Sequence, residues 1–143
     1  MIEVDLRRFA LFAGLAEEEL DAVAAHLEVR ELAADDVLWR EGEGAGGLVL
    51  LQEGALRIDS RCDGELGRCE APACFGAASL VADGPREASA VAAGVGVAFT
   101  LSRTAFGRLL EDSPRAAARL LAAIATDLAR LLRDGLPFVG RER

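Results

Sequence analysis

The sequence predicts a mainly β fold, a sandwich or barrel of short strands, with helices at both ends of the chain. Apolar and polar residues alternate along short segments between residues 37 and 101, which is the period of a half-buried strand. Turn signals separate these segments at intervals of about eight to twelve residues. Apolar residues recur at helical spacing before and after this region. No long helix interrupts the strands, which disfavours a parallel sheet of βαβ units.

The 143 residues fit one domain that can bury a core without metal or disulfide support. A hydrophobic content of 52% excludes a disordered chain. The longest apolar stretch, 92–101, is shorter than the ~20 residues of a membrane helix. The first twenty residues are rich in charge and hold no secretory signal, so we expect a soluble cytoplasmic protein. A net charge of −8 disfavours direct nucleic-acid binding.

A helix is predicted over 16–27, within a helical start that spans residues 1–30. Leu20 and Val23 share one apolar face at helical spacing. Three consecutive glutamates at its N-terminal end are favoured there by the helix dipole. His26, the only histidine, lies at the border of the apolar face, and we interpret it as a partly exposed helical residue.

The predicted β region spans residues 31–102. The loop 41–47 contains four glycines but lacks the Lys-Ser/Thr pair of a phosphate-binding P-loop, so we interpret it as a turn between strands. Residues 48–51 have the continuous apolar pattern of a buried strand. Strands are predicted at 37–40, 48–51, 55–60 and 95–101, the last with a single apolar face.

Two helices are predicted within residues 103–135, followed by a short tail at 136–143. Ser113 and Pro114 form the start signal of the second helix. Its apolar stripe has the alternating spacing of four and three residues that is typical of a coiled coil, and we predict a homodimer interface there. The alternative is that the stripe packs on the chain's own sandwich. The stripe consists of Ala117, Leu121, Ile124, Leu128 and Leu131, widened by Leu120 and Leu132.

No catalytic or metal-binding pattern is evident in the sequence. The spacing of Cys62, Cys69 and Cys74 matches no zinc or iron–sulfur motif, so we interpret them as core or surface residues. One histidine cannot supply the cluster of metal-binding histidines of a cupin enzyme, and no Ser-His-Asp set can be assembled. The sequence therefore predicts a non-enzymatic protein without a metal or other cofactor.

The segment from Phe75 to Ser89 has the composition of an anion cradle. Gly76 opens a short apolar turn, and Arg86 follows the turn signal Asp83-Gly84-Pro85. A glycine lets the backbone approach a ligand closely, and an arginine can bind two oxygens of a phosphate. Backbone N–H groups at the start of the short turn would favour a negative charge. Such an arrangement occurs in many turns, so on its own it is a weak signal for a ligand site.

Five segments together resemble the cyclic-nucleotide-binding domain family, which includes catabolite-activator-type regulators, kinase regulatory subunits and gated channels. The segments occur in the family's order and at plausible spacing, so they are specific as a set. The resemblance covers roughly residues 9 to 135 and implies an eight-stranded jelly roll flanked by helices. The matching segments begin at Phe12, Leu38, Leu50, Phe75 and Leu101.

The resemblance also implies a ligand site. Arg86 would pair with the cyclic phosphate, and small neighbouring residues would line the phosphate and ribose. Ligand-binding members carry a glutamate where this chain has Ala77, so the ribose hydroxyl would lose its acceptor at a cost of ~1–3 kcal/mol. Glu87 is expected to point outward. The implied ligand-binding residues are Phe75, Gly76, Ala77, Ala78, Arg86, Glu87, Ala88 and Ser89.

The function implied by the resemblance is that of a regulatory sensor, which binds a cyclic nucleotide such as cyclic AMP or cyclic GMP and signals through its C-terminal helix. Catabolite-activator-type regulators continue into a helix-turn-helix domain, which the tail 136–143 cannot form. We therefore expect a stand-alone sensor or a fragment of a longer regulator. Two alternatives stay open: a different anionic ligand, and a degenerate cassette that acts as a structural or protein-interaction module.

Overall fold

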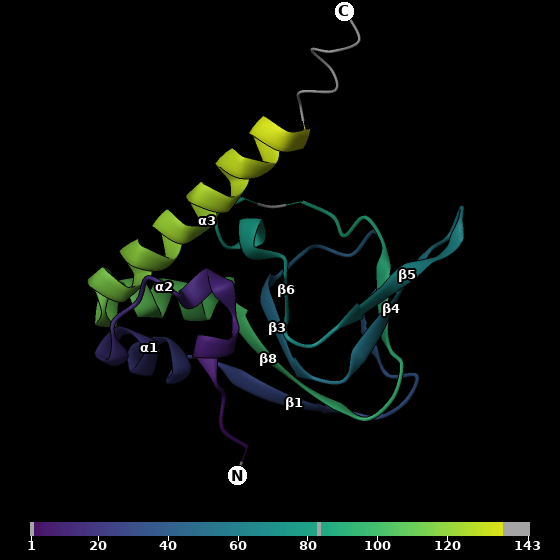
Figure 1. Cartoon of the computed structure of the whole chain (residues 1–143), viewed down its shortest axis with the longest axis horizontal. Coiled ribbons are helices and arrows are strands. Elements are labelled where there is room, and N and C mark those ends of the chain that lie inside the picture. The colour runs from purple at the N-terminus through teal and green to yellow at the C-terminus, as the bar shows by residue number, and fades with distance from the viewer. Residues whose placement is uncertain (1, 83, 136–143) are drawn as a thin grey trace, which may run out of the picture.

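The computed structural model describes residues 2–82 and 84–135, and its strands form two facing sheets (Figure 1). Each sheet has four strands, in the orders β1-β8-β3-β6 and β2-β7-β4-β5, and every pairing is antiparallel. The mainly β fold with flanking helices is therefore confirmed. The strands are β1 (Glu28–Leu32), β2 (Val37–Trp39), β3 (Gly47–Glu53), β4 (Ala55–Ser60), β5 (Gly64–Glu70), β6 (Ala73–Phe75), β7 (Ser89–Ala92) and β8 (Gly96–Ser102).

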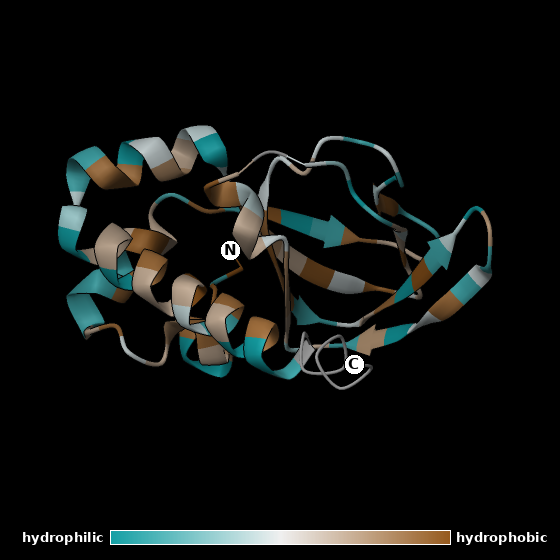
Figure 2. Ribbon diagram, turned by 90° about the horizontal axis from the view of Figure 1, so that it is seen from above, coloured by the Kyte–Doolittle hydropathy of each residue, from teal (hydrophilic) through white to brown (hydrophobic). Residues whose placement is uncertain are grey.

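The helices gather at one end of the molecule and the roll of strands lies at the other (Figure 2). One further short turn, η3, belongs to the roll and joins β6 to the segment before β7. No helix in the part of the chain that the structure describes is long and apolar enough to cross a membrane. The helical elements are η1 (Leu6–Arg8), η2 (Ala10–Phe12), α1 (Glu17–Ala24), η3 (Ala77–Leu80), α2 (Arg103–Asp112) and α3 (Pro114–Gly135).

The sheet that contains β3 is a middle layer with both faces buried. On β3, Leu48 and Leu50 pack against the helices, whereas Val49 and Leu51 pack between the two sheets. Side chains alternate between the faces of a strand, so burial of both faces requires a continuous apolar run. This arrangement explains the unbroken apolar pattern of this strand and confirms its prediction as a buried one.

The neighbouring strand β8 corrects a prediction. Its large residues, including Phe99, face the helices, as the alternation indicates. Its other face is also buried, because Ala98 packs between the sheets and is 1% exposed. The predicted single apolar face was wrong, since a small residue such as alanine gives a weak hydrophobic signal even where it is fully buried. Val95, predicted as the first residue of this strand, lies before it and is exposed.

Two of the strands that were not predicted, β1 and β5, were missed because most of their side chains are exposed. β1 begins at Glu28, inside the predicted helical start 1–30, and only Leu32 of this strand is buried. β5 is the edge strand of its sheet and has no buried residue. Neither strand shows the alternation of apolar and polar residues that marks a half-buried strand. Only their pairing with β8 and β4 identifies them.

Helix α3 begins at Pro114, as predicted, and its first turn is closed by the N–H of Ala117, which donates to the Ser113 carbonyl. Its apolar stripe has two environments. Ala117 and Ile124 are buried in the chain's own core, together with Leu120. Farther along the helix the side chains are exposed, namely those of Leu128, Leu131 and Leu132. Leu121 is partly buried against the same core. Ala117, Leu120 and Ile124 are thus unavailable to a second chain. The predicted tail 136–143 lies outside the described residues.

We predict that replacing Leu50 with alanine destabilises the fold strongly. Leu50 is fully buried in the middle layer, so a cavity remains where its side chain contacted the helices. The expected loss is ~2–5 kcal/mol in the free energy of unfolding, measured by chemical denaturation. The matched control is Leu66→Ala on β5, where the side chain is 56% exposed and the expected change is within ~0.5 kcal/mol. Equal losses in both variants would contradict the two-faced middle layer.

Candidate anion-binding site

A cavity of about 680 Å³ lies inside the roll, between η3 and the segment that precedes β7. This volume is in the range of about 300–1,000 Å³ that is typical of small-molecule sites. Its walls are mostly apolar, and one arginine contributes a positive charge. Six of the eight residues predicted for ligand binding line it, namely Phe75, Gly76, Ala78, Arg86, Glu87 and Ala88.

The guanidinium of Arg86 is packed into the wall of this cavity. Its Cζ lies 4.3 Å from the centroid of the Trp39 ring. Its Nη2 donates a long hydrogen bond of 3.4 Å to the carbonyl of Gly47. Its Nε is buried and has no hydrogen-bond partner among the described residues. Burial lowers the pKa of this guanidinium, although nearby Glu43 opposes the shift. The site therefore holds a partly dehydrated cation whose hydrogen-bonding capacity is not satisfied.

Gly76 allows this arrangement because it has no side chain. Its φ of 74° is in the left-handed region that favours glycine. A Cβ at this position would lie 2.6 Å from Nη1 of Arg86 and 2.6 Å from the carbonyl oxygen of Gly47. The hydroxyl of Ser79 lies 2.9 Å from that same carbonyl and fastens η3 to the start of β3. Gly76 thus brings the backbone close to the guanidinium of Arg86, whereas its predicted close approach to a ligand stays a prediction.

The glycine-rich loop 41–47 supports the backbone around Arg86. The N–H of Arg86 donates to the Glu43 carbonyl over 2.7 Å, and its own carbonyl accepts from the N–H of Gly42 over 2.8 Å. A third bond joins the N–H of Ala45 to the carbonyl of Gly84. The loop is therefore a turn between strands, as predicted, and it pairs with the segment that carries the arginine.

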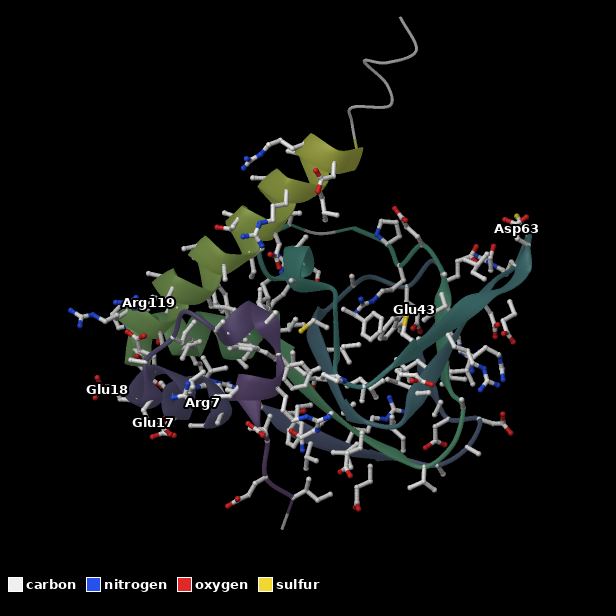
Figure 3. The ribbon with its side chains drawn as sticks, viewed as in Figure 1. Arg7, Glu17, Glu18, Glu43, Asp63 and Arg119 are labelled. Atoms are coloured by element: carbon white, nitrogen blue, oxygen red, sulfur yellow. The ribbon has the colours of Figure 1, made fainter. Side chains whose placement is uncertain are left out.

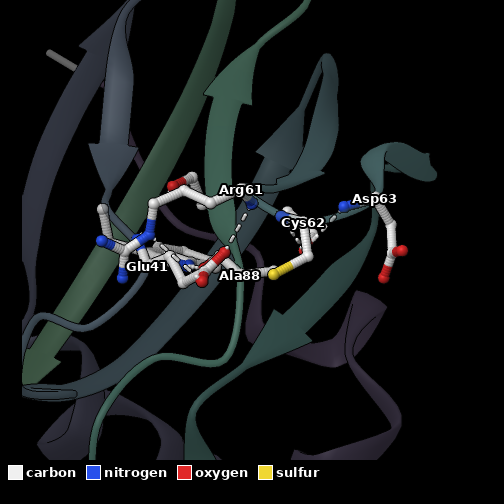
Figure 4. Close-up of polar contacts among 8 residues, drawn as sticks. Glu41, Arg61, Cys62, Asp63 and Ala88 are labelled. Atoms are coloured by element: carbon white, nitrogen blue, oxygen red, sulfur yellow. Dashed lines mark hydrogen bonds and ion pairs between the residues drawn. The ribbon is translucent and has the colours of Figure 1, made fainter.

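Two acidic residues of the same loop are held by local partners. The Glu41 carboxylate accepts from the backbone N–H of Arg61 over 2.9 Å and from its Nε over 3.2 Å (Figure 4). The backbone hydrogen bond and the charge of Arg61 lower the pKa of Glu41. Glu43 accepts from the N–H of Arg40 over 2.7 Å and lies within the outline of the roll, remote from Glu17 at the helical end (Figure 3). Glu43 is the acidic neighbour of Arg86.

Two residues predicted for ligand binding do not line the cavity. Ala77 packs against the helical core and lines a separate cavity of about 630 Å³ beneath α3, together with Asp127. The hydroxyl of Ser89 accepts from the N–H of Glu41 over 2.8 Å and so joins the loop 41–47 to the start of β7. Glu87 is exposed at the rim of the first cavity, in a bend before β7.

Sequence reasoning missed several residues of the cavity wall, most importantly Trp39. Its pairing with Ala90 across the sheet places its ring over Arg86, and the ring also lies 5.4 Å from that of Phe75. The alternation around Trp39 predicted a strand but could not identify the cavity that its ring lines. The other missed wall residues are Ala45, Ile58, Cys69, Ser79, Ala82, Gly84 and Pro85.

The three cysteines have separate environments. Cys69 lines the cavity, whereas Cys74 lies beneath α3, where desolvation and then the charge of Asp127 raise its thiol pKa to about 11. The third, Cys62, is exposed at the tip of the hairpin (Figure 4). Within residues 2–82 and 84–135, no group of three or more His, Cys, Asp or Glu side chains is placed to hold a metal ion. His26 instead bonds to the carbonyl of Ala22 and to Asp112.

Comparison with known proteins agrees with this geometry. The family model of the cyclic nucleotide-binding domain matches residues 29–113. The chain is similar to the N-terminal domain of a transcriptional regulator from Streptomyces coelicolor A3(2), with 30% identity and a TM-score of 0.79, over 92% of this chain and 94% of that one. No curated protein matches the chain.

Two further solved structures extend the comparison. The catabolite activator protein of Thermus thermophilus is 28% identical with a TM-score of 0.72, over 91% of this chain and 62% of that one. A putative cyclic nucleotide-binding protein from Geobacter metallireducens GS-15 is 25% identical with a TM-score of 0.68, over 88% of this chain and 95% of that one. The family model spans more than half of the sequence, including the whole cassette around Arg86, and the chain therefore belongs to the cyclic nucleotide-binding domain family.

Proposed function

We propose that the chain is the ligand-binding module of a cytoplasmic regulator, without enzymatic activity, and that its ligand is a cyclic nucleotide bound at Arg86. The observation that carries this proposal is the dehydrated guanidinium with an unpaired Nε in the wall of a cavity. An anionic phosphate would supply the hydrogen bonds that the cation lacks, and charge-assisted bonds of this kind are the strong ones. Membership of the family supports a cyclic phosphate as that anion.

The rest of the cavity supports a ligand with an apolar, planar part. Trp39, Ile58 and Phe75 contribute aromatic and aliphatic surface, against which a nucleobase can pack. Small residues, such as Ala78 and Ala88, leave room near Arg86. A volume of about 680 Å³ is large enough for a mononucleotide.

A second candidate function is that of a degenerate module that binds no nucleotide and acts through protein contacts. The observation that favours it is Ala77, which replaces the family's ribose-binding glutamate and packs against the helical core. Glu43, whose charge acts on Arg86, also opposes the approach of an anion.

For signalling, we propose that the exposed part of α3 forms a homodimer interface. Leu128, Leu131 and Leu132 are 38%, 65% and 58% exposed, so a second copy could bury them. Ala117 and Ile124, by contrast, would stay in the core of each chain. Ile124, Leu128 and Leu131 also line the cavity beneath α3, next to Ala77 and Ala78 of the cassette. A change in the cassette would thus reach the helix directly.

We predict that Arg86→Ala weakens the binding of cyclic AMP by about 100-fold or more, measured by isothermal titration calorimetry. Two hydrogen bonds from a charged group, at ~1.5–3 kcal/mol each, account for this magnitude. The control Arg115→Ala removes the same charge from an exposed position on α3 and is expected to leave the affinity unchanged. Binding by Arg86→Ala with unaltered affinity would refute the phosphate site. Absence of binding by the wild-type protein to any of a panel of cyclic nucleotides would favour the degenerate module.

We predict that the double variant Leu128→Asp/Leu131→Asp is a folded monomer, because two carboxylates at the proposed interface prevent its burial. Light scattering at micromolar concentration measures the mass, and circular dichroism measures the fold. The comparison variant Leu120→Asp places a carboxylate in the core and is expected to unfold. A monomeric wild-type protein would rule out the interface.

A further inference from the structure

Trp39 contacts the cation of the site through the face of its ring. The guanidinium of Arg86 lies over its ring at 4.3 Å, well within the ~6 Å of a cation–π interaction. The hydrogen bond from Nη2 to Gly47 is long, at 3.4 Å, and Nε has no partner in the described part of the chain. The ring of Trp39 therefore contributes to holding the dehydrated cation, beside one long hydrogen bond.

The ring of Trp39 is itself held in place on two sides. Its Nε1–H donates to the carbonyl of Ala88 over 2.9 Å, which ties the ring to the segment that carries Arg86. Its ring meets that of Phe75 at 5.4 Å with an interplanar angle of 59°. A side chain fixed by these contacts presents a stable face to a cation. Trp39 is also the only tryptophan of the chain, which makes its emission a direct report on this contact.

We propose that Trp39 is the positioning residue for Arg86: its ring covers one face of the guanidinium and keeps the cation at the wall of the cavity. Stacking occupies a face and leaves the N–H groups at the edge available, so the same contact that holds the cation leaves it able to bind an anion. The effect of Trp39 on ligand affinity rests on the proposed function. The contact between ring and guanidinium does not.

The position of Arg86 matters because two carboxylates of the chain, those of Glu43 and Glu87, could compete with a ligand for it. Glu43 already attracts the guanidinium, and Glu87 follows Arg86 at the rim of the cavity. The ring of Trp39 is the cation–π partner that the structure gives to Arg86, so without it we expect Arg86 to pair with one of these carboxylates. An arginine paired in this way is withdrawn from a ligand. Trp39 thus acts by keeping the cation away from internal competitors.

The first experiment needs no ligand. The buried Nε–H of Arg86 is expected to give a guanidinium N–H signal in heteronuclear NMR, because its proton exchanges slowly with solvent. The signal is assigned by its loss in Arg86→Lys. Trp39→Phe keeps an aromatic face but loses the bond to Ala88, and it is expected to retain the signal. Trp39→Leu is expected to lose it while remaining folded by circular dichroism. Retention of the signal in folded Trp39→Leu would overturn the proposal.

Two further measurements keep this test decisive. If Trp39→Leu does not fold, Trp39→Met replaces it with a flexible apolar side chain. The emission of Trp39 in the ligand-free protein is also expected to change in Arg86→Met, because the cation leaves the ring. Unchanged emission in this variant would overturn the proposal without any substitution of the tryptophan.

The second experiment measures affinity for cyclic AMP by calorimetry. Trp39→Leu is expected to bind about 3- to 30-fold more weakly, the range that a cation–π contact supplies, and Trp39→Phe to bind within about 3-fold of the wild type. Adding Glu43→Gln to Trp39→Leu is expected to restore part of the loss. Wild-type affinity in Trp39→Leu would overturn the positioning role. If the wild type binds no cyclic AMP, the proposed ligand fails, and the ligand-free measurements alone decide the role of Trp39.

Discussion

The central strands β8 and β3 bury both of their faces, and the position of the candidate site depends on this constraint. One face packs on the helices and the other on the second sheet, so a single strand, β3, contributes to both cores. The same strand begins at Gly47, whose carbonyl accepts from Arg86 and from Ser79. The sheet therefore places the candidate site at a fixed position relative to the helices.

The candidate site depends on a balance between burial and charge. Arg86 is partly dehydrated and incompletely hydrogen-bonded, which costs free energy, whereas stacking on Trp39 and attraction to Glu43 offset part of that cost. A cation held in this way binds an incoming anion more readily than a cation that is already paired with a carboxylate. The exposed pair Arg7–Glu17, at the helical end, shows the contrasting case of a cation already matched to a carboxylate (Figure 3).

The fold was largely predictable from the sequence because buried strands and amphipathic helices leave periodic patterns. The strand at 55–60, the buried run at 48–51 and the start of α3 at Pro114 were predicted within a few residues. Exposed strands such as β1 leave no such pattern, and Ala98 is too small to mark a second buried face. Within the site, Gly76 and Arg86 were found by local motif. Trp39 was not, because its proximity to Arg86 arises only when β2 pairs with β7.

Three hydrogen bonds join loop 41–47 to the segment of Arg86, and all three are made by backbone atoms. Their donors are the N–H groups of Gly42, Ala45 and Arg86, and this has a consequence for how the site can evolve. Such bonds constrain side-chain identity only weakly at Ala45 and Arg86, whereas the φ of 88° at Gly42 favours glycine. Residues such as Ile58, Cys69 and Ala88 can therefore be exchanged without dismantling the support of the arginine. Such a scaffold allows related proteins to evolve different ligand preferences through changes in the residues that line the cavity. A designer of a new sensor can change the same lining residues.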